Sequence, residues 1–302
     1  MITLTLLLLG CEISRLPLPS LVDRARILGV ASEPAEPAPG EQVTLYSLAV
    51  DPEQGIGAVT WFGCVLEDSS GFGCDLDSEK LEELFAMDLE GMTQEEQAAW
   101  FEELQAAGFI GVEPDLPPSF TVPTDLLDGL SEEESTQGKN YLFTLSALPG
   151  EGSLDNVDLD AQGQSLAETG LKRMPVSVNP YPNQNPVIAS LVLDETFDLQ
   201  DQDTLTVQAG QTYDFVMTLT EGSVEAYTFL NSEGQVEDRI EQPYASFYST
   251  GGTFYQDISL YPYLAARWTA PVDPERSEHN IWLVLRDRRG GMNWISLNLI
   301  VE

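Results

Sequence analysis

The spacing of turns constrains the fold of this chain more than any other feature. Between residues 26 and 66, three strand-like runs (26–31, 42–50 and 58–66) are separated by turns rich in Pro, Gly and acidic residues (33–40 and 51–57). Strands at this spacing are typical of a β-sandwich and not of an alternating β-α fold. The chain is therefore predicted to begin with an all-β sandwich.

A helical insert is predicted to interrupt this first unit at about residues 78–108. Apolar side chains at helical spacing share one face there: Leu81, Leu84, Phe85 and Leu89. Thr93 with Glu96 forms a capping-box pattern that opens a second helix, and Gly108 stands where a left-handed residue ends it. Strand character returns at 139–148 and 171–178, which would close the first domain.

A second all-β unit is predicted after a linker. Residues 179–186 contain three prolines and three asparagines, a composition that sustains neither strand nor helix. Candidate strands follow at 187–193, 205–208, 211–219, 225–230, 265–268, 280–285 and 293–301. The last two flank the turn 286–291, where paired glycines would relieve the steric cost of positive φ. The predicted domains are therefore 26–178 and 187–302.

Three segments resemble bacterial immunoglobulin-like and polycystic-kidney-disease-like domains. Val50-Asp-Pro-Glu-Gln-Gly, followed by Val59-Thr-Trp61, looks like their turn and third strand. Residues 282–291 look like their final hairpin, and Asn185-Pro-Val-Ile like their beginning. The resemblance implies a mainly β fold with two immunoglobulin-like β-sandwich domains in tandem, the first carrying the helical insert. It implies no catalytic residues, because this fold hosts many unrelated functions.

The apolar N-terminal run ends in Leu8-Leu9-Gly10-Cys11, which resembles a bacterial lipobox. This implies that residues 1–11 are a lipoprotein signal segment, that Cys11 is acylated, and that residues 12–25 are a tether. Each buried methylene of an acyl chain adds about 0.8 kcal/mol of membrane affinity. The run lacks the Lys or Arg usual in an export signal, so a buried apolar strand or a plain secretory signal is the alternative.

With this motif the whole chain resembles the two-module surface lipoproteins of myxobacteria and their relatives. The resemblance implies an exported protein, lipid-anchored in the bacterial cell envelope at the outer membrane or cell surface. It carries no assigned function with it.

The charge of the chain restricts its partners. Fifty acidic residues against 13 basic ones give a formal net charge of −37. Such a surface repels the phosphate backbone of nucleic acids, which excludes them as partners. It also repels anionic lipid headgroups, so membrane association must depend on the N-terminal lipid. The remaining expected partners are an envelope protein or a glycan.

The three cysteines fit an exported protein. When Cys11 is acylated, Cys64 and Cys74 remain as an even pair. A disulfide between them would close a short loop and stabilise the fold by about 2–3 kcal/mol. A metal site would need more ligands than these two thiols, and the single histidine, His279, lies far away in the sequence.

The sequence contains no assembled catalytic motif. His279 lies in the polar segment 274–280 and is predicted to be a surface residue. No nucleophile elbow, phosphate-binding glycine loop or zinc spacing accompanies it. A carboxylate pair could serve a glycosidase, but with 50 acidic residues the presence of pairs selects nothing.

Asp155, Asp158 and Asp160 are the candidate metal ligands. Oxygen ligands at alternate positions in a glycine-containing loop suit calcium. Counted from Asp158 the loop starts like an EF-hand, but its twelfth residue is Thr169. The alternative is a solvated acidic loop. No other cofactor is expected.

Residues 244–263 hold five tyrosines and two phenylalanines among Ser, Thr and Gly. This stretch is predicted to be one loop or two short strands. Tyr244, Tyr248 and Tyr255 are the candidate binding residues, because tyrosine gives rigid amphipathic contact area at low entropic cost. The alternative is the aromatic interior of the sandwich.

Two functional hypotheses follow from these patterns. The favoured one is a non-catalytic cell-envelope lipoprotein that acts as a binding or spacer module. The alternative is an exported hydrolase, or an accessory subunit of an envelope enzyme complex, that uses carboxylates the sequence does not single out.

Overall fold

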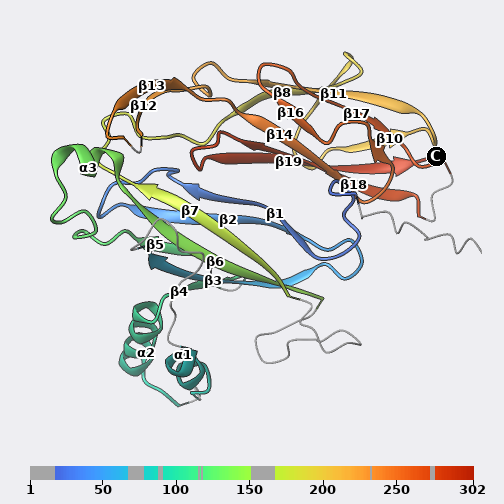
Figure 1. Ribbon diagram of the computed structural model, residues 1–302. Coiled ribbons are helices and arrows are strands. Elements are labelled where there is room, and N and C mark those ends of the chain that lie inside the picture. The colour runs from blue at the N-terminus through green and yellow to red at the C-terminus, as the bar shows by residue number, and fades with distance from the viewer. Residues whose placement is uncertain are drawn as a thin grey trace, which may run out of the picture.

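The fold consists of two β-sandwiches (Figure 1). The computed structural model describes residues 18–66, 78–87, 91–114, 116, 118–150, 167–231, 233–272 and 276–302. Within these ranges the chain is mainly β, and its strands form two immunoglobulin-like domains in tandem, as predicted.

The first sandwich pairs a three-stranded sheet with a four-stranded one. The strand orders are β1-β2-β5 and β4-β3-β6-β7. The bounds are β1 Arg26–Glu33, β2 Gln42–Val50, β3 Ile56–Val65, β4 Phe109–Glu113, β5 Ser119–Thr121, β6 Lys139–Pro149 and β7 Glu168–Val176. Trp61 of β3 and Phe143 of β6 are fully buried between the sheets. A buried tryptophan on the third strand is typical of immunoglobulin-like sandwiches.

The second sandwich has two five-stranded sheets, ordered β10-β19-β18-β14-β16 and β15-β17-β11-β8-β9. The bounds are β8 Ile188–Leu193, β9 Phe197–Leu199, β10 Thr204–Val207, β11 Thr212–Leu219, β14 Tyr244–Ser249, β15 Thr253–Phe254, β16 Ile258–Leu260, β17 Leu264–Thr269, β18 Glu278–Arg286 and β19 Met292–Val301. A separate hairpin pairs β12 (Ala226–Leu230) with β13 (Val236–Ile240). The Tyr-rich stretch is thus three short strands, β14 to β16, instead of the one loop or two strands predicted.

The helical insert is present and lies beside β4. Within the insert, helix α1 covers Ser78–Phe85 and α2 covers Gln94–Ala106. A short third helix, α3, lies outside the insert and covers Glu132–Gln137. The predicted capping box forms, since Glu96 N donates to Thr93 Oγ1 and Thr93 N donates to Glu96 Oε2. Phe109 packs against both α1 and α2. No helix in the described part of the chain is long and apolar enough to cross a membrane.

The two sandwiches pack face to face (Figure 1). The outer side of β1 and β2 meets the outer side of β18 and β19 through a separate apolar cluster. Its buried members are Val22, Leu28, Leu48, Trp282 and Val284. Gly29 permits this approach, because a Cβ on it would lie 3.1 Å from Trp294 Cε3. Each of these sheets therefore has two covered faces where they meet.

The described parts of the predicted tether and linker belong to this junction. Val22 N donates to Ser249 O (2.8 Å), and Ser249 N donates to Ser20 O (2.9 Å), so residues 20–22 lie against β14. Asn183, in the predicted linker, is fully buried. Its side-chain Nδ2 donates to Asp287 Oδ2 at 2.9 Å.

Candidate functional site

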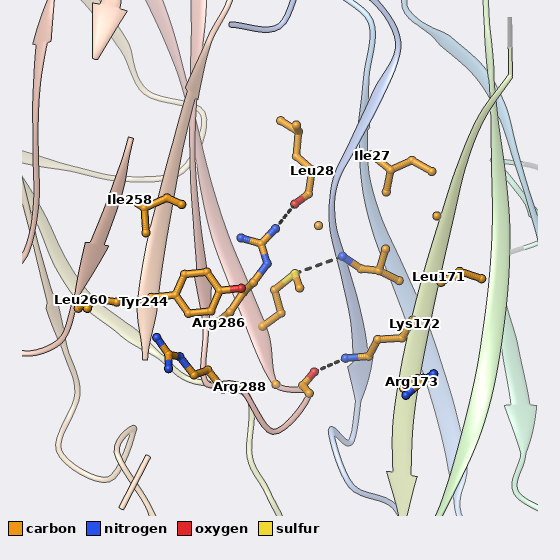
Figure 2. A pocket seen from close by; sticks show the side chains of 16 residues that line it. Ile27, Leu28, Leu171, Lys172, Arg173, Tyr244, Ile258, Leu260, Arg286 and Arg288 are labelled. Carbon is orange, nitrogen blue, oxygen red and sulfur yellow. Dashed lines mark hydrogen bonds between the residues drawn. The ribbon is translucent and has the colours of Figure 1, made fainter. Parts of the chain in front are cut away.

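A cleft of about 760 Å³ opens at the junction of the two sandwiches. Figure 2 shows β1 and β7 of the first sandwich on one side, and β14 with the β18–β19 hairpin of the second on the other. The lining residues come from residues 27–30, 170–173 and 290–292, together with Tyr244, Ile258, Leu260, Arg286 and Arg288. This volume lies within the range of about 300–1,000 Å³ typical of small-ligand sites.

The cleft gathers positive charge in a strongly acidic protein. Four of the 13 basic residues line it, namely Lys172, Arg173, Arg286 and Arg288. None of its lining residues is Asp or Glu. Lys172, Arg286 and Arg288 form no ion pair with any carboxylate in the described part of the chain. The cleft is therefore an electrostatic exception in a chain with 50 acidic residues.

The two arginines are held by neutral groups and by an aromatic ring. Arg286 donates through Nη2 to Leu28 O (2.5 Å) and through Nη1 to Ser246 Oγ (3.2 Å). The guanidinium carbons of Arg286 and Arg288 lie 5.8 and 5.4 Å from the centroid of the Tyr244 ring (Figure 2). Such cation–π contacts orient a guanidinium without neutralising its charge. The positive charges thus remain directed into the cleft.

Lys172 reaches the same cleft from β7. It is buried, and its Nζ donates to Gly290 O at the hairpin turn (Figure 2). The pKa of Lys172 is lowered to about 8. Burial is the main cause of this shift, the Asp287 carboxylate opposes it, and the charge of Arg286 adds to it. An anion in the cleft would favour the charged form of this amine.

Arg289, next to Arg288 in the hairpin, has the opposite surroundings. Its guanidinium contacts Glu36 Oε2 at 3.2 Å, Glu225 Oε2 at 3.0 Å and Glu241 Oε1 at 3.0 Å. Glu36 belongs to the first sandwich and the other two to the second, so the network joins the domains. Burial raises the pKa of Glu241 to about 7 and also raises that of Glu225. This network is enclosed and does not line the cleft.

The predicted tyrosine set is not brought together in one patch. Tyr244 lines the cleft, and Tyr248, on the same face of β14, packs at the junction near Arg26. Tyr255 lies at a second cavity of about 570 Å³, beside Arg267 and Asp214. Only Tyr244 therefore contributes to the cleft.

The other predicted site residues are placed as follows. Cys64 lies on β3 and is disulfide-bonded. Cys74, Cys11 and the candidate calcium ligands Asp155, Asp158 and Asp160 lie outside the described residues. The pairing of Cys64 with Cys74, the acylation of Cys11 and the calcium site therefore stay predictions. Among the described residues, no group of three or more His, Cys, Asp or Glu side chains is placed to hold a metal.

The prediction of a surface histidine is wrong. His279 is the second residue of β18 and is only 6 % exposed. Its ring packs against Gly251, where a Cβ would lie 2.5 Å from the ring, and Nδ1 is 3.4 Å from Thr250 Oγ1. Burial lowers its pKa, which favours the neutral form of the ring. It lines neither the cleft nor the second cavity.

The described carboxylates give no support to glycosidase chemistry. A general acid needs a raised pKa in a cleft that holds substrate. The second cavity contains acidic residues, but Asp214 there has a lowered pKa because Arg267 hydrogen-bonds to it. The carboxyls with raised pKa, Glu225 and Glu241, are engaged by Arg289.

Sequence reasoning missed the cationic cleft. The signal available was the run Arg286-Asp-Arg-Arg289, which places three of the chain's few basic residues in one turn. Lys172 could not be joined to it, because 118 residues separate it from its partner Gly290.

Comparisons with known proteins identify no family for this chain. No protein-family model matches the chain, and no curated protein matches it. Solved structures that it resembles include the two tandem V-type regions of the v-region-containing chitin binding protein VCBP3. That match has 10 % identity, covers 91 % of this chain and 100 % of that one, and has a TM-score of 0.29.

Two further structures are similar to the same extent. The fibronectin(III)-like modules of Clostridium thermocellum CbhA match at 9 % identity, over 91 % of this chain and 94 % of that one, with a TM-score of 0.25. The D0-D1 domain of intimin matches at 8 % identity, over 91 % and 98 %, with a TM-score of 0.22. Likenesses this distant transfer no function to this chain.

Proposed function

We propose that this protein is a non-catalytic binding module of a bacterial cell envelope. In this proposal acyl chains on Cys11 hold it at a membrane, and its ligand binds in the cleft between the sandwiches. The observation that carries the proposal is the set of cleft cations, Lys172, Arg286 and Arg288, which form no salt bridge with a carboxylate among the described residues.

The packing of the domains supports a binding role over a spacer role. A spacer gains length when its domains are joined end to end. Here the sandwiches share an apolar cluster and the Arg289 network, which fixes one against the other. Fixed walls preorganise a cleft, and preorganisation lowers the entropic cost of binding.

Photo-crosslinking in the producing cells tests the binding role. A photoreactive amino acid at Leu260, which is 55 % exposed in the cleft, should form crosslinks to an envelope component. The same amino acid at Val272, which is 80 % exposed and outside the cleft, is the matched control. Crosslinks at Leu260 that disappear in Arg288→Glu support the proposal, and equal crosslinking at both positions contradicts it.

Metabolic labelling with an alkyne fatty acid tests the anchor. Label should be lost in Cys11→Ser and retained in Cys64→Ser. Label that persists in Cys11→Ser would exclude lipid attachment at this residue.

A further inference from the structure

We propose that the cleft binds a small amphiphilic anion, with its carboxylate or phosphate group at the arginines of the β18–β19 hairpin and its apolar part along the neighbouring aliphatic side chains. This inference rests on the proposed binding function and adds the chemical class of the ligand.

The charges of the cleft select the anionic group. Arg286 and Arg288 converge on Tyr244 from one side of the cleft, and Lys172 enters from the other (Figure 2). Guanidinium groups present several donors in a plane that matches the oxygens of carboxylate and phosphate. A neutral ligand would leave Arg286 and Arg288 without a counter-charge, in a chain whose other arginines include three with carboxylate partners.

The net charge of −37 does not prevent such binding. At physiological salt the Debye length is about 8 Å, so distant carboxylates are largely screened. A small anion inside the cleft contacts the local cations and meets no lining carboxylate. An extended polyanion would also cover the acidic surface outside the cleft. The charge pattern therefore favours a small ligand over nucleic acid or an anionic membrane surface.

Aliphatic side chains in the same cleft select the apolar part. Leu171, Ile258 and Leu260 line it and are 48 %, 50 % and 55 % exposed. Covering such surface contributes about 25 cal/mol per Å². A free inorganic anion would contact the cations alone and leave this surface in water. The combination of cations and exposed aliphatics therefore fits an amphiphile better than phosphate itself.

Isothermal titration calorimetry tests this inference on the full-length Cys11→Ser protein. The probes are dodecyl phosphate, laurate, dodecyl maltoside and inorganic phosphate, each below its critical micelle concentration where it has one. Dodecyl phosphate, laurate or both should bind with one-to-one stoichiometry, and the tighter of the two identifies the head group. Dodecyl maltoside, with the same tail and no charge, and inorganic phosphate should bind at least 10-fold more weakly.

Matched variants place the binding in the cleft. Arg288→Met should weaken the anionic amphiphile at least 10-fold, and Arg288→Lys should restore part of the affinity. Leu260→Ser should weaken the amphiphile as well. Arg267→Met, in the second cavity, removes a cation outside the cleft and should change nothing.

A second readout uses the buried amine of Lys172. Its charged neighbours, Asp287 and Arg286, are fixed by hydrogen bonds within the protein. At pH 8 an anion in the cleft should draw a proton onto Lys172, so the measured enthalpy should depend on the ionisation enthalpy of the buffer. Lys172→Met should abolish this dependence.

The outcomes separate the ligand class from the binding function. The proposal of an amphiphilic anion is overturned if dodecyl maltoside binds as tightly as the anionic amphiphiles, or if Arg288→Met binds them with wild-type affinity. If no amphiphile binds but Leu260 still crosslinks specifically in cells, the ligand class is wrong and the binding function stands. If neither occurs, both proposals fail.

Discussion

Arg288 and Arg289 are neighbours in one hairpin, yet their surroundings are opposite. Arg289 is enclosed by three carboxylates from both domains. Arg288 is exposed, lies over Tyr244 and meets no carboxylate among the described residues. Acidic side chains are abundant in this chain, so a shortage of carboxylates does not explain why Arg288 has no acidic partner among the described residues. The difference indicates that one arginine holds the domains together and the other is available to a ligand.

The largest expected effect is on the enclosed network. Arg289→Met should destabilise the protein by about 3–5 kcal/mol, because it leaves buried Glu36 and Glu241 without their counter-charge. Urea unfolding measures this loss. Arg267→Met is the control, since the Arg267–Asp214 pair is half exposed and its loss should have little effect. A loss at Arg289 as small as that of the control would contradict its structural role.

Lys172→Met should stabilise the protein, in contrast to Arg289→Met. Without ligand the buried ammonium is costly, so replacing it should stabilise the protein at pH 7 by roughly 1–4 kcal/mol. The folded pKa is depressed to about 8 from 10.5. Wild-type stability should therefore rise relative to Lys172→Met as the pH rises from about 8 to 10.5. A variant that is less stable than wild type at pH 7 would show that the hydrogen bond to Gly290 outweighs burial.

Glu241 should make the junction sensitive to pH. Its folded pKa is raised from 4.5 to about 7 by burial, so the folded state binds more protons than the unfolded state in this range. The contribution of Glu241 to the free energy of unfolding is fully present below pH 4.5. It is lost as the pH rises through 7, and this loss amounts to roughly 1–3 kcal/mol. The difference in unfolding free energy between wild type and Glu241→Gln should follow this curve. A difference that is constant from pH 4.5 to 8 would place the titration elsewhere.

Arg288→Met should have the smallest effect on stability. The side chain is exposed and forms no described ion pair, so unfolding should change by no more than about 0.5 kcal/mol. The thermal midpoint checks this. A loss comparable to that of Arg289→Met would remove the contrast between the two arginines.

Sequence patterns were sufficient for most of the longer strands, which alternation and turn residues mark, but they did not predict β4, β5, β9 or β13. The predicted run 42–50 coincides with β2, and 211–219 differs from β11 by one residue. The hairpin at 286–291 formed, but positive φ occurs at Arg288 (75°) and Gly290 (121°) and not at Gly291. Gly291 is required for space instead, since a Cβ would lie 2.1 Å from Asp287 Oδ2.

The packing of one sandwich on the other was not predicted, although a trace of it exists in the sequence. Trp282 and Val284 point to the opposite side of β18 from Ile281, Leu283 and Leu285. A sheet with one face in water would place polar residues there. Two apolar faces on β18 indicate that both sides of this strand are buried. They do not indicate which part of the chain packs on the second side. The cleft follows from that docking, so its residues could not be assembled from local patterns.

An anion in the cleft should reach only some of the arginines, and the chain has only ten to observe. The side-chain Nε–Hε resonances of the ¹⁵N-labelled Cys11→Ser protein, assigned by single substitutions, can be followed while dodecyl phosphate is added. We expect those of Arg286 and Arg288 to shift saturably, and those of Arg289 and Arg267 to remain unchanged. Shifts at Arg289 or Arg267 equal to those at Arg288, or no saturable shift at Arg288, would contradict the division between a structural arginine and a binding one.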